Sequence, residues 1–101
     1  MGQSRVTTDV AAPTAIYSGK TTVAAAGTRV ALASAQAVLG VTIKALSTNS
    51  GKIYVGGAAV AAANGFQLAA GETASLDISD LSTIEIDSDI NGEGVTYLAV
   101  G

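Results

Sequence analysis

Short runs rich in valine, isoleucine, threonine and tyrosine recur along this chain, and glycine, asparagine, aspartate or serine fills the gaps between them. A spacing of about ten residues is typical of β-sandwiches and barrels, because β-branched and aromatic side chains suit a pleated surface. The gap residues are those that form tight turns. We therefore predict an all-β, single-domain antiparallel β-sandwich of about seven or eight short strands, connected as a jelly roll or a Greek key.

The clearest hairpin is predicted around residues 48–51, where Asn49 and Gly51 supply the backbone conformations that a tight turn needs. In the strand before it, residues 41–46, Val41, Ile43 and Ala45 face one way, which indicates one buried face. Its partner strand is expected at 52–55. Further strands are expected at residues 20–25, 28–33, 66–68, 73–78, 83–87 and 95–100.

Two local details follow from the same patterns. Ser18 and Gly19 are predicted to form a turn, because serine and glycine are common turn residues. Glu85 and Asp87 are predicted to face water, because they alternate with isoleucines along one strand.

Apolar positions at a period of two along these strands define the predicted core. Tyr97 and Leu98 are neighbours and face opposite ways, so one of them is a candidate interface residue. The predicted core consists of Val23, Val30, Leu32, Val41, Ile43, Ile53, Val55, Phe66, Leu68, Leu76, Ile78, Ile84, Ile86, Tyr97 and Leu98.

The first fourteen residues are poor in apolar side chains until Val10, and Pro13 stands near their end. We predict that residues 1–14 form an extended arm and residues 15–101 the sandwich domain. Because terminal segments are ordered only where something ties them down, we expect a neighbouring chain to hold the arm.

The chain lacks histidine, cysteine and tryptophan. It therefore has neither the commonest general base, nor a thiol nucleophile, nor the commonest transition-metal ligands. No glycine-rich run precedes a predicted helix, so a phosphate cradle is not expected. These absences predict a protein that is not an enzyme and that carries no cofactor.

Only 13% of the residues are charged and 49% are hydrophobic, chiefly alanine and valine. A typical soluble domain has about 25% charged residues. We expect some of this apolar surface to be buried against another protein or other copies of the chain, with a trimer as the favoured homo-oligomer. The predicted partner-binding residues are Arg5, Val6, Val10, Pro13, Ile16 and Tyr17.

The charges are unevenly distributed along the chain. All five basic residues lie in the first 52 positions, and seven of the eight acidic residues follow them. Interleaved strands would mix these charges in space. Alternatively, the acidic half forms a patch that binds a basic partner. Nucleic acid is not expected as a partner, because the basic residues are few and scattered. No uncharged stretch reaches the roughly 20 apolar residues of a membrane span.

One run resembles a metal site. In residues 87–93, Asp87, Asp89 and Asn91 place oxygens at alternate positions before a glycine, as in the first half of a calcium loop. The twelfth position is Leu98, where such a loop requires a glutamate. We therefore expect an acidic surface hairpin with no metal, and keep calcium binding by these three residues as an alternative.

Several segments together resemble small β-rich virion proteins of tailed bacteriophages, a likeness that covers roughly residues 20–100 and consists of turn and strand patterns. The resemblance implies a structural component of the phage particle, with a capsid decoration (cement) protein favoured. It implies the major capsid protein or another virion protein as partner, and a location on the capsid surface after assembly in the host cytoplasm. The segments are VTIKAL (41–46), GKIYVGG (51–57), NGFQLAAGE (64–72), LDISDLSTIEID (76–87) and NGEGVTYL (91–98).

Two other functions remain open at this point. One is a β module of the tail, baseplate or fibre that contacts the host. The other is a calcium- or sugar-binding β module. Sugar binding has little support in the sequence, because tryptophan is absent and the tyrosines are scattered.

Overall fold

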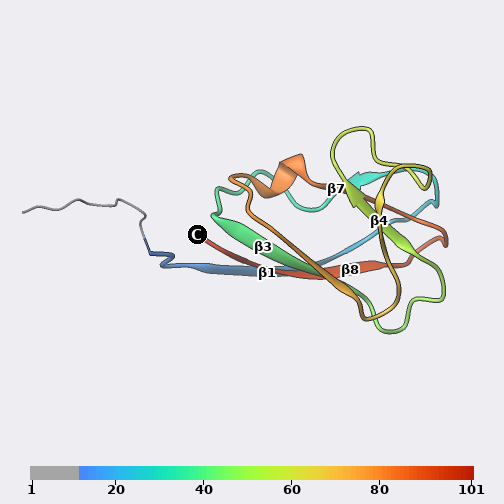
Figure 1. Cartoon of the computed structure of the whole chain (residues 1–101), viewed down its shortest axis with the longest axis horizontal. Coiled ribbons are helices and arrows are strands. Elements are labelled where there is room, and N and C mark those ends of the chain that lie inside the picture. The colour runs from blue at the N-terminus through green and yellow to red at the C-terminus, as the bar shows by residue number, and fades with distance from the viewer. Residues whose placement is uncertain (1–11) are drawn as a thin grey trace, which may run out of the picture.

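Two antiparallel sheets of four strands form the described part of the chain, residues 12–101, in a computed structural model (Figure 1). Sheet A contains, in spatial order, β1 (Ile16–Thr22), β8 (Gly94–Val100), β3 (Gly40–Ala45) and β6 (Thr73–Leu76). Sheet B contains β2 (Val30–Ala31), β7 (Glu85–Ser88), β4 (Ile53–Gly56) and β5 (Phe66–Leu68). The one helical element of residues 12–101 is the 3-10 turn η1 (Leu81–Thr83).

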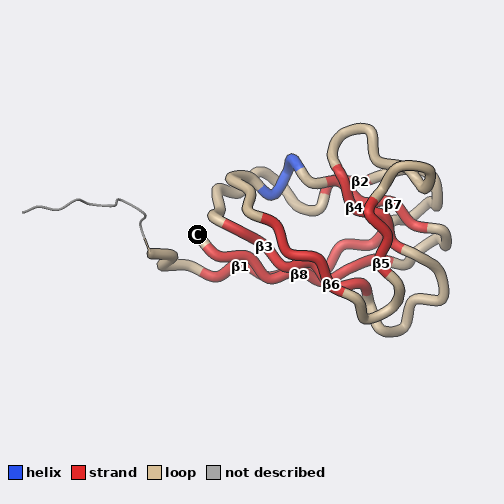
Figure 2. The backbone as a smooth tube through the Cα atoms, viewed as in Figure 1, coloured by secondary structure: helices blue, strands red, loops and turns tan. Residues whose placement is uncertain are grey.

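The pairing of the strands is that of a jelly roll. β1 pairs with β8, β2 with β7, β3 with β6 and β4 with β5, all antiparallel. These four pairs are nested, and the β3–β8 and β4–β7 ladders join them into two sheets (Figure 2). The predicted antiparallel β-sandwich with seven or eight strands is confirmed, and the connections are those of a jelly roll.

The core lies between the two sheets and follows the period of two that the sequence shows. In β3, Val41, Ile43 and Ala45 are buried and the residues between them are exposed. From sheet B, Ile53 and Ile86 meet them, each with no exposed surface. Each of the buried valine and isoleucine side chains contributes about 1.5–3 kcal/mol when it is fully removed from water.

Most of the predicted core is confirmed, but three members are wrong. Phe66, Leu76 and Leu98 keep 64%, 39% and 54% of their surface exposed. Leu98 points to the outer side of sheet A, opposite Tyr97. Phe66 and Leu76 lie on edge strands, beyond which no further strand of residues 12–101 is paired. The buried members are Val23, Leu32, Val41, Ile43, Ile53, Val55, Leu68, Ile84 and Ile86; Val30, Ile78 and Tyr97 are half-buried against them.

The predicted turn at Ser18 and Gly19 is wrong, because both residues lie inside β1. Gly19 is paired with Tyr97 of β8. A Cβ atom on Gly19 would lie only 2.7 Å from the Tyr97 hydroxyl oxygen. The glycine is therefore needed to seat the tyrosine ring against the strand, and it does not bend the chain there.

The prediction that Asp87 faces water is also wrong. Asp87 is 3% exposed, because the loop of residues 24–29 folds over it. Its Oδ1 accepts hydrogen bonds from the backbone N–H groups of Gly27, at 2.9 Å, and Ser88, at 2.8 Å. Glu85 is partly exposed, and its carboxylate pairs with Arg29 at 2.9 Å.

Each side of the sandwich has a seam, where an edge strand of sheet A faces an edge strand of sheet B. At the β1/β2 seam the chain crosses between sheets through residues 23–29. At the β5/β6 seam it crosses through the tight turn at residues 69–72, where Glu72 N donates to Ala69 O at 2.9 Å. Among residues 12–101, no helix has the length and hydropathy needed to cross a membrane.

Candidate protein–protein interface

The acidic hairpin between β7 and β8 anchors loops. Asn91 Oδ1 accepts a hydrogen bond from the Ala26 backbone N–H at 2.7 Å, so Asn91 and Asp87 both hold the loop of residues 24–29. Asp89 points elsewhere, toward β4. Within residues 12–101, no three aspartate, glutamate, histidine or cysteine side chains are grouped to hold a metal ion. All three residues of the alternative calcium site accept hydrogen bonds from other groups of the protein: Asp87 and Asn91 from the loop of residues 24–29, and Asp89 from residues 52 and 54.

Asp89 instead contacts β4 and the residue that precedes it. Its Oδ1 accepts from the Tyr54 hydroxyl at 2.9 Å, and its Oδ2 accepts from the Lys52 backbone N–H at 3.1 Å. The hydrogen bond to Asp89, together with burial and the negative charges of Asp89 and Asp87, raises the pKa of the Tyr54 hydroxyl above its usual value. This contact is structural, because it ties the hairpin to the strand.

Two further carboxylates hold backbone turns. Glu93 accepts from the backbone N–H groups of Ser50 and Gly51 at 2.8 and 2.9 Å, and these bonds lower the pKa of the Glu93 carboxyl. Asp80 accepts from Ser82 N at 2.9 Å and caps η1, and this bond is the first cause of its lowered pKa. Both carboxylates therefore stabilise turns of the fold by accepting hydrogen bonds from backbone N–H groups.

The outer side of sheet A carries an exposed apolar cluster where the described chain begins. By the register of the sheet, Ile16, Leu98 and Val100 lie on this side, and we call them the apolar end. Ile16 is 72% exposed and Leu98 is 54% exposed. Leu39, next to β3, is a further exposed apolar side chain nearby, and its backbone N–H donates to Val100 O at 2.7 Å.

The rest of this outer side consists mainly of hydroxyl side chains and carries few charges. One row across the four strands consists of Ser18, Leu98, Thr42 and Ser75, and the Thr42 and Ser75 hydroxyls lie 2.9 Å apart. The next row carries the two lysines of the sheet, and it runs Lys20, Thr96, Lys44 and Thr73. The outer side therefore offers apolar contact at one end and two positive charges farther along.

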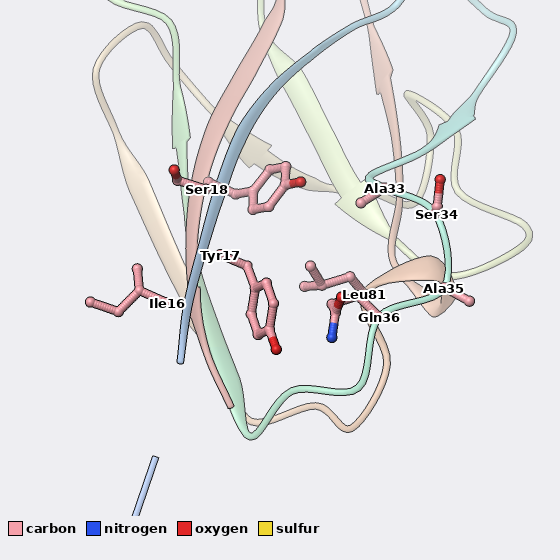
Figure 3. Close-up of a pocket in the computed structure, with 9 residues that line it drawn as sticks. Ile16, Tyr17, Ser18, Ala33, Ser34, Ala35, Gln36 and Leu81 are labelled. Atoms are coloured by element: carbon pink, nitrogen blue, oxygen red, sulfur yellow. The ribbon is translucent and has the colours of Figure 1, made fainter. Parts of the chain in front are cut away.

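A groove of about 500 Å³ lies beside β1 on its other side (Figure 3). The ring of Tyr17 points into it, toward Leu81 and Gln36, whereas Ile16 points away. Among residues 12–101, no carboxylate, lysine or arginine lines this groove, so these residues supply no acid–base pair there. Its lining residues are Ile16, Tyr17, Ser18, Ala33, Ser34, Ala35, Gln36, Leu81 and Tyr97.

The predicted partner-binding residues divide into two groups. Arg5, Val6 and Val10 lie outside the described residues. Pro13 and Ile16 are exposed, whereas Tyr17 is half-buried and packs against the core.

Sequence reasoning did not assign Val100 or Leu39 to the interface. The sequence pattern that indicates this interface lies in β8. Its last two outward positions, Leu98 and Val100, are as apolar as the inward ones. A strand with two apolar faces indicates that something covers both sides. For Leu98 and its neighbour Tyr97, the prediction that they face opposite ways is confirmed.

Comparison with protein-family models, with curated proteins and with solved structures finds no match to this chain.

Proposed function

We propose that this protein is a structural component of a tailed-bacteriophage particle, and specifically a capsid decoration protein. Its role is to bind the outer surface of the shell and join neighbouring capsid subunits through protein–protein contacts. The observation that carries the proposal is the apolar end, which exposes large aliphatic side chains on a sheet face that otherwise carries mainly serine, threonine and lysine.

The chemistry of the described residues supports adhesion. The carboxylates discussed above accept hydrogen bonds from the protein, and the described residues that line the groove beside β1 include no ionised pair. A face of serine and threonine with an apolar end suits an interface of moderate size, and many weak copies of such an interface stabilise a shell collectively.

The fold and the resemblance add support of a more general kind. The segments that resemble phage virion proteins include most of β3, β4, β5, β7 and β8, but only Leu76 of β6. Jelly rolls occur in viral capsid proteins, but they also occur in lectins and cupins. The fold therefore permits the proposed function without specifying it.

The proposal is tested on particles purified from the phage whose genome encodes the chain. We expect the protein in head fractions at many copies per particle, and we expect shells without it to open at lower temperature. An Ile16→Asp, Leu98→Asp double variant should be lost from the heads. Ile90→Asp is the matched control, because Ile90 is 42% exposed in the turn between β7 and β8.

Recovery of the protein in tail fractions alone would overturn the decoration role in favour of a tail module. Recovery in neither fraction would overturn a virion role altogether. Retention of the double variant on heads at the level of the control would show that the apolar end is not the binding surface.

A further inference from the structure

The β5/β6 seam contains an apolar groove of about 490 Å³. Val55 of β4 and Ile84, which directly precedes β7, are both buried and line it on one side, and Ala74 and Leu76 line it from sheet A. Phe66 stands at its rim with 64% of its surface exposed. We call the set Val55, Phe66, Ala74, Leu76, Ile78 and Ile84 the seam groove. Exposed apolar surface gathered in one groove is typical of a protein contact site.

One wall of the seam groove is an unprotected strand edge. The four residues of β6, Thr73–Leu76, pair with β3 on one side, and no described residue pairs with their other side. Proteins commonly protect such edges with lysine or proline, and β6 has neither. An extended peptide bound here would gain backbone hydrogen bonds from the edge and side-chain contacts from the groove.

Such a peptide needs an apolar face toward the groove and a polar face toward water. Residues 6–10 of this chain, Val-Thr-Thr-Asp-Val, have that pattern. At a period of two, Val6, Thr8 and Val10 share one face, and Thr7 and Asp9 share the other. All five residues except Asp9 are β-branched, as suits a strand.

The same copy cannot supply this strand, because its chain is fixed at the opposite edge of sheet A. The N–H groups of Thr14 and Ala15 both donate to Gly101 O at 2.7 Å, and Gly101 N donates to Ala15 O at 2.9 Å. Figure 1 shows the C-terminus beside the start of β1.

A strand added to β6 would lie four strand spacings from β1, roughly 19 Å away. From Thr14, the four residues back to Val10 span at most about 14 Å. Val10 of the same copy therefore stops short of the seam groove.

We propose that residues 6–10 of one copy add as a fifth strand to the β6 edge of a second copy, with Val6 and Val10 filling the seam groove. The contact is heterologous, so repetition with a closing rotation gives a ring. This inference does not rest on the proposed decoration role, because it concerns the purified chain alone.

The first test is complementation between two full-length variants, with mass measured by light scattering. Val6→Asp, Val10→Asp damages the donor segment, and Leu76→Asp damages the acceptor groove. We expect the unmodified chain to be oligomeric and each variant alone to be monomeric. A 1:1 mixture of the two variants retains one intact donor and one intact acceptor, and it should form a heterodimer. Ile90→Asp should keep the oligomer.

A monomeric unmodified chain, variants that keep the oligomer, or a mixture that stays monomeric would each overturn the proposal. Circular dichroism checks that Leu76→Asp is folded, which its position at an exposed edge favours.

A second test needs no groove substitution and uses the absence of cysteine in the chain. Ser75→Cys places a thiol on the outer side of β6, and Thr7→Cys places one on the outer face of the donor strand. A short bis-maleimide should cross-link the mixture of these two variants at least tenfold more than either variant alone. Equal yields in all three samples would overturn the proposal even if Leu76→Asp fails to fold.

Discussion

The two seams of this sandwich are each formed by two edge strands, but they differ in hydrogen bonding across the seam and in how much apolar surface stays exposed. At the β1/β2 seam, the Thr21 hydroxyl donates to Leu32 O at 2.5 Å, and Val23 fills the crossing with no exposed surface. At the β5/β6 seam, no hydrogen bond between described residues joins the two strands, and Phe66 and Leu76 stay exposed. The β1/β2 seam is thus bridged at Thr21 and filled at Val23, although a groove remains beside the start of β1, whereas the β5/β6 seam has no such bridge between described residues and presents apolar surface.

The difference comes from the length of the two crossings. Seven residues, 23–29, cross the β1/β2 seam, so the chain can fold over Asp87 and deliver Leu32 to the core. The turn at 69–72 is too short to cover anything beyond itself. Completion of a sandwich edge therefore depends on the connection as well as on the strands that it joins.

The largest expected effect compares a leucine from each seam. Leu32 is 1% exposed at the β1/β2 seam and Leu76 is 39% exposed at the other. We expect Leu32→Ala to lower the free energy of unfolding of the monomer by about 2–5 kcal/mol, because it removes a fully buried side chain. Leu76→Ala should cost less than about 1 kcal/mol. Urea denaturation at low protein concentration measures both, and equal losses would contradict the distinction between the seams.

The next effect compares a glycine packed against β1, Gly94 of β8, with Gly57, which lines the groove at the β5/β6 seam. A Cβ on Gly94 would overlap the backbone of Thr21 and Thr22 in β1, whereas a Cβ on Gly57 would meet nothing within 4 Å. Gly94→Ala should therefore destabilise the fold by about 1–3 kcal/mol, because β1 and β8 must separate. Gly57→Ala should change stability by less than about 0.5 kcal/mol. Thermal unfolding of the two variants measures both changes in stability. If Gly94→Ala were as stable as the unmodified chain, β1 would be able to shift away from β8 without cost.

A smaller effect isolates the hydrogen bond that bridges the β1/β2 seam. Thr21→Val keeps the shape of the side chain but leaves Leu32 O without this donor. We expect a loss of about 1 kcal/mol in the free energy of unfolding. Thr22→Val, at the next and exposed position of β1, is the control and should have little effect. Similar losses of unfolding free energy in the two variants would show that the change from threonine to valine acts through strand propensity and not through the hydrogen bond to Leu32 O.

The smallest effect concerns pH. Because the pKa of Glu93 is lowered in the folded state from its ordinary 4.5, this carboxylate stabilises the fold fully above pH 4.5, and the stabilisation is lost as pH falls through the lower folded pKa. Glu93→Gln should therefore differ most from the unmodified chain near pH 7 and least near pH 3. Denaturation midpoints at the two pH values test this, and a constant difference would assign the effect to packing.

Strand positions could be predicted from the sequence because the alternation of apolar residues is local. In β3, Val41, Ile43 and Ala45 are enough to indicate the buried face. The strand expected over residues 28–33 contains only the two residues of β2. Arg29 before it forms an ion pair with Glu85, and Leu32 after it is buried in the core. Local pattern therefore defines which face is buried better than where a strand ends.

The exposure of individual side chains could not be predicted, because it depends on the order of strands in the sheets. Phe66 and Leu76 have the period of core residues but lie on edge strands, and nothing in their own segments shows this. Asp87 reads as a surface residue until the loop of residues 24–29 is placed over it. Of the candidate interface, Ile16 was predicted from the sequence, whereas the clustering of Leu98 and Val100 beside it required the register of β8 with β1.

The hydrogen bonds between Ala15 and Gly101 bring the first described strand and the last residue together. A short peptide linker joining residue 12 to residue 101 would then close the backbone with little strain, and new ends could be opened at the exposed residues 62–63. Such a circular permutant would keep all eight strands of residues 12–101 while moving both termini to the opposite part of the molecule. A tag or cargo attached there would project away from the sheet end that carries Ile16.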